Sequence, residues 1–286
     1  MNIEDLQPTK IVVLTGAGMS TESGVPDFRS QRGLWSRYNP AKVASVDSLE
    51  NHYELFSEFY RERMKALRTI EPHRGHRILA EWEEAGKLHA IATQNVDGLH
   101  QVAGNKNVLE LHGSIRSTRC HQCERVQSEE TFLRSTHCEH CQGVLRPNVV
   151  LFGEMLPELV WDEAVKKIEE ADVLLVIGTS LQVSPVNQLP YVAKGKTVYI
   201  NDEPSDFPFD FWINKTISSG LSDLKKKRGD RRYDVTFVFI VAFSYYVHRD
   251  ENSSKHARRG RKKRFKLKVT IKIVHYYLLV ICTNED

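Results

Sequence analysis

Features that mark secreted, membrane-spanning or disulfide-bonded proteins are scarce in this sequence. The first ten residues carry acidic and polar groups without an apolar run, so no secretory leader is expected. No stretch reaches the roughly 18 apolar residues that a membrane-spanning helix needs. Cysteine is rare, with 5 in 286 residues, and four of them form two C-x2-C pairs, which favours a thiolate metal site over disulfides. We therefore expect a folded cytosolic protein, whose 41% hydrophobic composition can supply a core.

Acidic side chains are also scarce, but only toward the end of the chain. Residues 225–286 contain 17 Lys and Arg against 6 Asp and Glu, a balance of +11. Residues 1–224 contain 23 against 31, a balance of −8. The formal net charge of +3 therefore combines two parts of opposite sign, and the last 62 residues differ in kind from the rest.

Short β-branched runs alternate with amphipathic stretches over most of the chain. Four runs are expected as buried strands that end in small or polar residues: Lys10–Thr15, His89–Thr93, Val173–Ile177 and Thr197–Ile200. Helical spacing predicts helices over residues 73–85 and 157–171, the second with an apolar face of Leu159, Val160, Ala164, Val165 and Ile168. The alternation predicts an α/β fold with a mostly parallel sheet, whose carboxyl edge binds ligands.

Two segments interrupt this alternation. Residues 30–72 are helical and aromatic in character, and residues 115–148 contain the cysteine pairs. Together they predict a second lobe over the edge of the sheet.

The cysteine series C-x2-C-x14-C-x2-C predicts a zinc site. Its members are Cys120, Cys123, Cys138 and Cys141. This spacing suits tetrahedral coordination by four thiolates, which leaves no position for a zinc-bound water. The metal is therefore predicted to be structural and to brace a lobe too small to bury its own core. The fifth cysteine, Cys282, is expected to be structural as well.

The glycine-rich segment after the first predicted strand has two interpretations. Gly16 and Gly18 would let backbone N–H groups approach a pyrophosphate. The third glycine, Gly24, is not three places after Gly18, however, so an ordinary strand-to-helix turn is the alternative. Residues 20–29 suit a mobile flap over a ligand, with a solvated loop as the alternative.

Polar residues with catalytic potential follow the second predicted strand. Gln94, Asn95 and Asp97 should project from the same sheet edge as Gly16, although they would also serve to cap the next helix. His112 precedes the first zinc cysteine by eight residues, and it is either a general base or a structural histidine.

Jointly, these motifs resemble the sirtuins, a family of NAD-dependent protein-lysine deacylases. The matching segments, in family order over roughly residues 8–227, are Gly16–Arg29, Thr93–His100, Leu111–Gly113, the four cysteines, Val150–Glu154, Gly178–Ser180 and Asn201. The resemblance implies a Rossmann-like large lobe (about residues 8–30, 73–114 and 149–227) and a small zinc-ribbon and helical lobe (about residues 31–72 and 115–148). NAD and an acyl-lysine peptide would bind between the lobes.

The resemblance also implies roles for individual residues. The expected cofactor-binding residues are Gly16, Ala17, Gly18, Ser20, Asp27, Phe28, Arg29, Gln94, Asn95, Asp97, Gly178, Thr179, Ser180, Asn201, Asp202, Glu203 and Ile217. Asn95 and Asp97 would contact the nicotinamide side, and Asn95 and His112 are the expected catalytic residues. After the acyl oxygen attacks ribose C1′, His112 would act as a general base through the ribose hydroxyls. The products would be lysine, nicotinamide and an O-acyl-ADP-ribose.

The acylated substrate would lie as an added β-strand between two segments, as the resemblance implies. One segment is Phe152-Gly153-Glu154 and the other contains Val183. Tyr60 and Arg63 match a pair with which some sirtuins bind the carboxylate of succinyl- or malonyl-lysine, and a packed tyrosine with a solvated arginine is the alternative. Two rival functions stay open: a mono-ADP-ribosyltransferase that uses the same NAD site, and a non-catalytic zinc module that binds nucleic acid.

Residues 228–286 have no counterpart in this resemblance. Basic runs at Lys225–Arg232 and Arg258–Lys268 alternate with apolar runs at Val235–Val247 and Val269–Ile281, which are too short to span a bilayer and predict β-strands. The tail would form a hairpin with a basic linker between its strands, or be attracted to nucleic acid or an acidic membrane surface. A non-native extension, such as a reading-frame accident would produce, is the third alternative. A monomer is expected.

Overall fold

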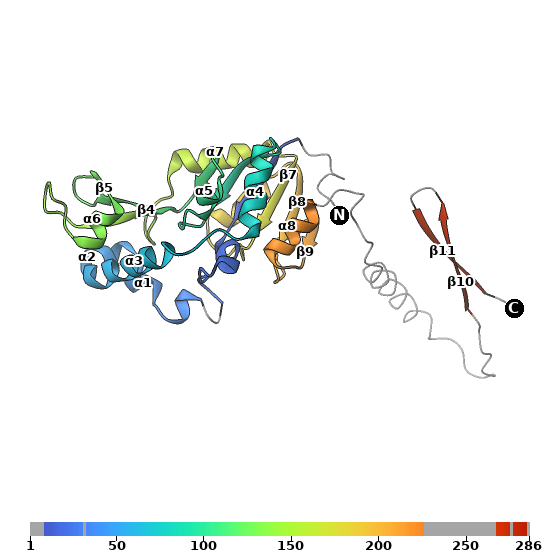
Figure 1. The fold of residues 1–286 in the computed structure, drawn as a ribbon, viewed down its shortest axis with the longest axis horizontal. Helices are drawn as coiled ribbons and strands as arrows, with labels where there is room; N and C mark the ends of the chain where they lie inside the picture. The colour runs from blue at the N-terminus through green and yellow to red at the C-terminus, as the bar shows by residue number, and fades with distance from the viewer. Residues whose placement is uncertain (1–8, 31–32, 226–266, 275–276, 285–286) are drawn as a thin grey trace. The chain divides into compact units, whose positions relative to one another are not determined.

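The computed structural model describes residues 9–30, 33–225, 267–274 and 277–284 (Figure 1). The chain divides into two compact units, Met1–Arg231 and Arg232–Asp286. The first unit contains the helices, the main sheet and the cysteine cluster. Among the described residues, no helix combines the length and apolar character needed to cross a bilayer.

Six parallel strands form the central sheet of the first unit, in the order β3-β2-β1-β7-β8-β9. They are β1 (Ile11–Thr15), β2 (Leu88–Thr93), β3 (Val108–Glu110), β7 (Val173–Ile177), β8 (Lys196–Ile200) and β9 (Phe211–Ile213). The four strands predicted from apolar runs are present within one residue of their expected ends. This confirms the α/β class. The short edge strand β3 was not predicted, because three residues carry too little periodicity.

Both faces of the sheet are covered by helices. These are α4 (Arg74–Glu84) and α8 (Ile217–Lys225) on one face, and α7 (Glu158–Glu169) and the 3-10 helix η4 (Val186–Val192) on the other. Alternation along each strand divides the apolar side chains between the two cores: in β1, Ile11 and Val13 join the first and Val12 and Leu14 the second. The strands therefore read as continuous apolar runs.

The apolar face predicted for α7 needs one correction. Ala164 and Ile168 are buried against the sheet, but Leu159 is 85% exposed. Leu159 lies on the opposite side of α7 from Ile168, because nine residues make about two and a half helical turns, whereas Val160 and Trp161 in the same first turn pack against the core. The buried stripe is therefore narrower than the predicted apolar face.

A smaller sheet and a group of helices share a separate core. The sheet has the antiparallel order β5-β4-β6, with β4 (Gly113–Cys120), β5 (Val126–Gln127) and β6 (Leu145–Val149). The helices are α1 (Pro40–Val43), α2 (Val46–Asn51), α3 (Tyr53–Leu67) and α6 (Glu129–Arg134). Phe56 and Phe59 of α3 and Phe132 of α6 pack in one buried cluster with Cys120 and Cys138. The two segments that interrupt the α/β alternation therefore pack against each other.

Three short helices remain among the described residues of the first unit. They are the 3-10 helices η2 (Ala17–Ser23) and η3 (Leu34–Ser36), and α5 (Leu99–Ala103). The helix η2 follows β1 and α5 follows β2, so both begin near the carboxyl edge of the sheet.

The second unit contains an antiparallel hairpin, β10 (Leu267–Val274) and β11 (Tyr277–Asn284). Both strands fall within or next to the second apolar run, Val269–Ile281, so the two halves of this run pair with each other. The hairpin expected from the sequence instead joined this run to Val235–Val247, a segment outside the described residues. The side chain of Cys282 in β11 and most of the basic runs also lie outside the description.

Candidate active site

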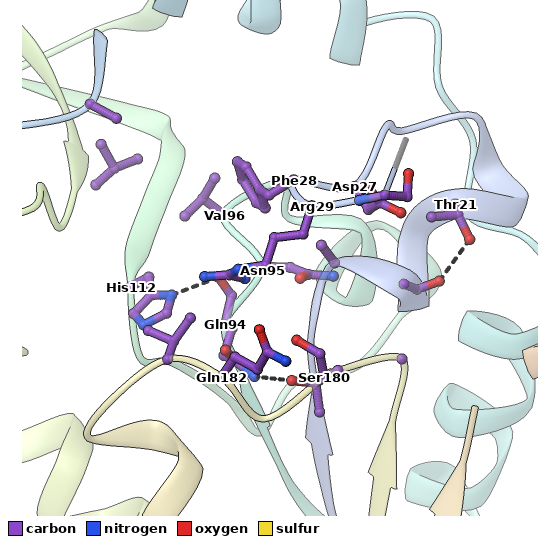
Figure 2. Close-up of a pocket in the computed structure, with 18 of the residues that line it drawn as sticks. Thr21, Asp27, Phe28, Arg29, Gln94, Asn95, Val96, His112, Ser180 and Gln182 are labelled. Atoms are coloured by element: carbon purple, nitrogen blue, oxygen red, sulfur yellow. Dashed lines mark hydrogen bonds between the residues drawn. The ribbon is translucent and has the colours of Figure 1, made fainter. Parts of the chain in front are cut away.

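A cavity of about 650 Å³ opens where the carboxyl ends of the central strands meet the loops of the helical and zinc-ribbon part (Figure 2). Most of the predicted site residues line it: Ala17, Gly18, Asp27, Phe28, Arg29, Tyr60, Arg63, Gln94, Asn95, His112, Phe152, Gly153, Glu154, Gly178, Thr179, Ser180, Val183, Asn201, Asp202, Glu203 and Ile217. The remaining predicted cofactor residues, Gly16, Ser20 and Asp97, are not part of this lining.

The glycine turn after β1 packs against the turn after β7. The amide of Gly18 donates to the carbonyl of Gly178 at 2.8 Å. A Cβ atom at Gly18 would lie 2.9 Å from the Gly178 Cα, and Gly178 itself has φ +59°. Glycine is therefore required here for the close approach of two backbones. Neither sequence interpretation had included this contact.

A buried chain of hydrogen bonds joins Asn95, Ser20 and Asp97. The Asn95 Nδ2 donates to Ser20 Oγ at 3.1 Å, and Ser20 Oγ donates to Asp97 Oδ2 at 2.7 Å. The other carboxylate oxygen of Asp97 accepts from the Leu99 amide at 2.9 Å, at the start of α5. Asp97 therefore accepts from the first amide of the next helix and, through Ser20, orients Asn95.

His112 lies on the cavity wall, and one of its ring nitrogens forms a hydrogen bond. Its Nδ1 lies 3.1 Å from the carbonyl oxygen of Gln94. A carbonyl can only accept, so Nδ1 carries the proton and Nε2 keeps its lone pair. Burial lowers the pKa of His112, and the hydrogen bond with Gln94 raises it to a smaller extent. The imidazole is therefore held in its neutral form near pH 7.

The other walls of the cavity come from segments far apart in the sequence. Figure 2 shows Phe28, Asn95, His112 and Ser180 around the same space. Gln94 Nε2 donates to Thr179 Oγ1 at 2.9 Å, which ties the end of β2 to the end of β7. At the far end, Asn201 Nδ2 donates to the Tyr199 hydroxyl at 2.7 Å.

Tyr60 and Arg63 reach the cavity from α3. Tyr60 is 3% exposed, and burial raises its pKa to about 12. The Arg63 guanidinium carbon lies 5.4 Å from the ring centres of both Phe28 and Phe59, and burial lowers the Arg63 pKa. Within the described part of the chain, no carboxylate forms an ion pair with Arg63. Tyr60 is therefore packed, as the alternative interpretation of this pair predicted. Arg63, which that interpretation predicted to be solvated, instead forms part of the cavity wall.

Phe152, in the segment expected to bind the peptide, is hydrogen-bonded to the backbone of the helical part. The Phe152 amide donates to the Ala44 carbonyl at 2.9 Å, and the Phe152 carbonyl accepts from the Val46 amide at 3.1 Å. This places Ser45 and Phe152 in a parallel bridge. The peptide groups of Phe152 are therefore occupied by neighbouring backbone, a contact that no local pattern could reveal.

Glu154 forms an ion pair with a buried arginine that the sequence analysis did not identify. Arg146 is 1% exposed, and its two terminal nitrogens donate to Glu154 at 2.5 and 2.9 Å. The Leu151 amide also donates to Glu154, at 2.8 Å. Burial raises the pKa of Glu154, but the hydrogen bonds outweigh it and leave the pKa below its usual range. The carboxylate therefore braces the loop, and its charge is already neutralised.

The four cysteine sulfurs form a compact group away from the cavity. All four lie within 4.8 Å of one another, with Cys120 and Cys141 3.4 Å apart and Cys123 and Cys138 3.9 Å apart. A tetrahedron with Zn–S bonds of about 2.3 Å has sulfurs about 3.8 Å apart. The donor set therefore fits zinc. None of these cysteines lines the cavity.

Comparison with known proteins gives consistent matches. Residues 16–185 match the model of the Sir2 family. "NAD-dependent protein deacetylase 1" of Geobacillus kaustophilus is 54% identical over 199 residues, which cover 68% of this chain and 82% of the relative. "NAD-dependent protein deacetylase" of Oceanobacillus iheyensis is 49% identical over 211 residues, which cover 72% of this chain and 89% of the relative.

Solved structures show the same similarity. A Sir2 homolog–NAD complex superposes with a TM-score of 0.73 and 37% identity, over 78% of this chain and 92% of that one. A Sir2 mutant solved with a deacetylated p53 peptide and 3′-O-acetyl-ADP-ribose superposes with a TM-score of 0.72 and 33% identity, over 80% of this chain and 99% of that one.

Proposed function

The chain belongs to the Sir2 family, and we propose on this basis that it is an NAD-dependent protein deacetylase. The reaction transfers the acyl group of an acyl-lysine to ADP-ribose and releases nicotinamide. The observation that carries the proposal is the position of His112, whose free Nε2 faces a cavity that Asn95 and the two packed glycine turns also line.

The cavity suits NAD in size and in its polar groups. A volume of about 650 Å³ lies within the range of small-molecule sites. We assign Asn95, with Ser20 and Asp97 behind it, to the nicotinamide side, and Asn201 to the adenosine side. The phosphates and the adjoining ribose would be held by Ala17, Gly18, Thr179 and Ser180. When bound, NAD supplies the glycosidic carbon that accepts the acyl oxygen and the nicotinamide that leaves.

The protein residues then bind, orient and move a proton. Asn95 presents an amide whose orientation is set through Ser20, so it can solvate the departing nicotinamide without rearrangement. His112 takes up a proton at Nε2 from the ribose hydroxyls, and its lowered pKa keeps that nitrogen unprotonated near neutrality. Arg29 and Phe28, which line the cavity, would cover the reacting ribose of bound NAD, and the exclusion of water would favour transfer of the acyl group over hydrolysis.

The peptide would pair with backbone that the protein leaves available. The Gly153 amide and carbonyl have no backbone partner among the described residues, whereas those of Phe152 are occupied. Recognition through backbone pairing selects little for sequence, so we expect a broad set of acylated proteins as substrates. Zinc held by the four cysteines would brace the ribbon that contains β4 and β6 and would take no part in the chemistry.

Removal of acidic acyl groups belongs to the same proposal. The Arg63 guanidinium forms no ion pair with a carboxylate of the described residues and lies at the cavity wall, which Tyr60 also lines. A succinyl or malonyl carboxylate would therefore meet an unpaired cation and a hydroxyl. We infer that desuccinylation and demalonylation accompany deacetylation.

The test is an acetyl-lysine peptide incubated with NAD and followed by mass spectrometry. The expected result is NAD-dependent loss of one acetyl group from the peptide, with nicotinamide and O-acetyl-ADP-ribose appearing. Label transferred from NAD to protein, with the peptide unchanged, would instead establish the ADP-ribosyltransferase. Nucleic-acid binding without NAD consumption would establish the zinc-module alternative.

The C-terminal residues carry a separate part of the proposal. Their balance of +11 over residues 225–286 favours binding to nucleic acid or an acidic surface in the cytosol. Deletion of residues 228–286 should leave deacetylation by a monomeric enzyme unchanged and abolish retention on immobilised DNA and on anionic vesicles. Equal retention of both proteins would refute a role for the tail.

A further inference from the structure

The strand that joins His112 to the zinc site contains an unusual irregularity. In β4, Gly113 and Ser114 pair with Val149 and Asn148, but the next paired residue is Thr118, opposite Pro147. Residues 115–117 therefore have no ladder partners on β6, although Asn148 Nδ2 donates to Ser117 Oγ, and they form a bulge. A bulge redirects the backbone and side chains of the strand that contains it, and bulges occur frequently beside active sites.

The bulge is attached to the loop that follows β2. The Ile115 amide donates to the Val96 carbonyl at 2.9 Å. The Arg116 Nε donates to the Asp97 carbonyl at 2.6 Å, a short charge-assisted hydrogen bond. Residues 94–98 form neither helix nor strand, so contacts of this kind determine where the loop lies.

Gly98 shows how closely the loop and the arginine approach each other. Its φ is +72°, and a Cβ atom there would lie 2.8 Å from both Cδ and Nε of Arg116. Only glycine combines this backbone conformation with so near a side chain. The arginine stem and the loop therefore pack directly, in addition to the hydrogen bond.

Arg116 completes a set of bonds that fixes Asp97 from three directions. The two carboxylate oxygens accept from Ser20 and Leu99, and the backbone carbonyl accepts from Arg116. Asp97 in turn holds Ser20, which holds the side chain of Asn95. Loss of the Arg116 bond would leave the carbonyl of a 5% exposed residue without this donor and would allow the loop to shift.

We propose that Arg116 is a positioning residue for the nicotinamide end of the cofactor site. The inference rests on the proposed function, because it assumes that Asn95 contacts nicotinamide. Arg116 does not line the cavity, and it acts through its hydrogen bond to the backbone carbonyl of Asp97. The strand that begins beside His112 and ends at Cys120 thereby sets the geometry of the nicotinamide pocket.

The experiment compares two ligands that differ in the nicotinamide group. Arg116→Met should weaken NAD binding on the order of tenfold, as for loss of one charge-assisted hydrogen bond, while the affinity for ADP-ribose stays unchanged. Inhibition by free nicotinamide should weaken in parallel. Arg116→Lys, which retains a donor, should recover part of the preference for NAD.

The matched control is Arg119→Met, three residues along the same strand. Arg119 pairs with Glu124 at 3.4 Å and forms no hydrogen bond or ion pair with residues 94–98 in the described structure, so both affinities should match the wild type. Zinc content and thermal midpoint are measured for all variants. Equal loss of NAD and ADP-ribose binding in Arg116→Met, or unchanged binding of both, would overturn the inference. If wild-type protein binds NAD but deacetylates nothing, the proposed function fails while this comparison still stands.

Discussion

The Nδ1 atom of His112 lies 3.1 Å from the carbonyl oxygen of Gln94, the residue that directly follows β2. One contact thus determines the tautomer of the imidazole and ties it to the loop that carries Asn95. The base and the nicotinamide pocket are therefore positioned by the same short segment.

Replacement of His112 should separate catalysis from binding. We expect His112→Ala to reduce deacetylation by at least about a hundredfold, since general-base catalysis contributes on this order, with zinc content unchanged. The measurement is peptide deacetylation beside metal analysis of the purified variant. Gln101→Ala, on the surface of α5, serves as the control. Retention of wild-type activity in His112→Ala would exclude His112 as the base.

The pH dependence of the reaction should reflect the buried environment of His112. Burial lowers its pKa below the usual value of about 6.5, so the unprotonated base persists to lower pH than in a free histidine. The acidic limb of the kcat/KM profile, which reports groups of the free enzyme, should therefore have its midpoint below pH 6.5, with activity lost as pH falls through it. A midpoint above that value would contradict the effect of burial.

Exchange of the metal should leave the chemistry intact. Because four thiolates close the coordination shell, Co²⁺ or Cd²⁺ in place of zinc should support the same kcat within about twofold. Removal of the metal with a chelator should unfold the ribbon and abolish activity. Circular dichroism and deacetylation are measured on the same samples. A kcat that varies strongly with metal identity would indicate a catalytic metal.

Arg63 should determine the preference for acidic acyl groups. Arg63→Met retains an apolar stem beside Phe28 and removes the charge, so the ratio of desuccinylase to deacetylase kcat/KM should fall on the order of tenfold or more. Both rates are measured on one peptide sequence at several NAD concentrations. Arg61→Met, on the same helix and bonded to Phe132, provides the control. An unchanged ratio would end the desuccinylase hypothesis.

The ion pair between Arg146 and Glu154 should be important for stability. Glu154→Gln leaves a buried guanidinium without its counter-charge, which costs about 3–5 kcal/mol in such pairs. Because the pKa of Glu154 is lowered in the folded state, its contribution is present above the pKa of the unfolded chain and is lost as pH falls through the folded value. Denaturant unfolding at neutral and acidic pH measures both effects. A variant as stable as the wild type at neutral pH would contradict this account.

The sequence was sufficient for features that depend on local order. The strands at Ile11–Thr15 and Val173–Ile177 are continuous apolar runs because a parallel sheet buries both faces, and such runs are visible without a structure. The spacing of the four cysteines predicted their convergence, which the structure confirms. The order of the motifs indicated the family, which the comparisons confirm.

Partners far apart in the chain were decided only by the tertiary structure. Glu154, which lines the cavity, also pairs with Arg146, and the backbone of Phe152 is hydrogen-bonded to Ala44 and Val46. Nothing near Arg116 in the sequence indicates that a bulge directs it to Asp97. Periodicity and spacing report which side chains share a face or a metal, because they follow from backbone geometry. The residues far along the chain that such a face or side chain contacts depend on how the whole domain packs.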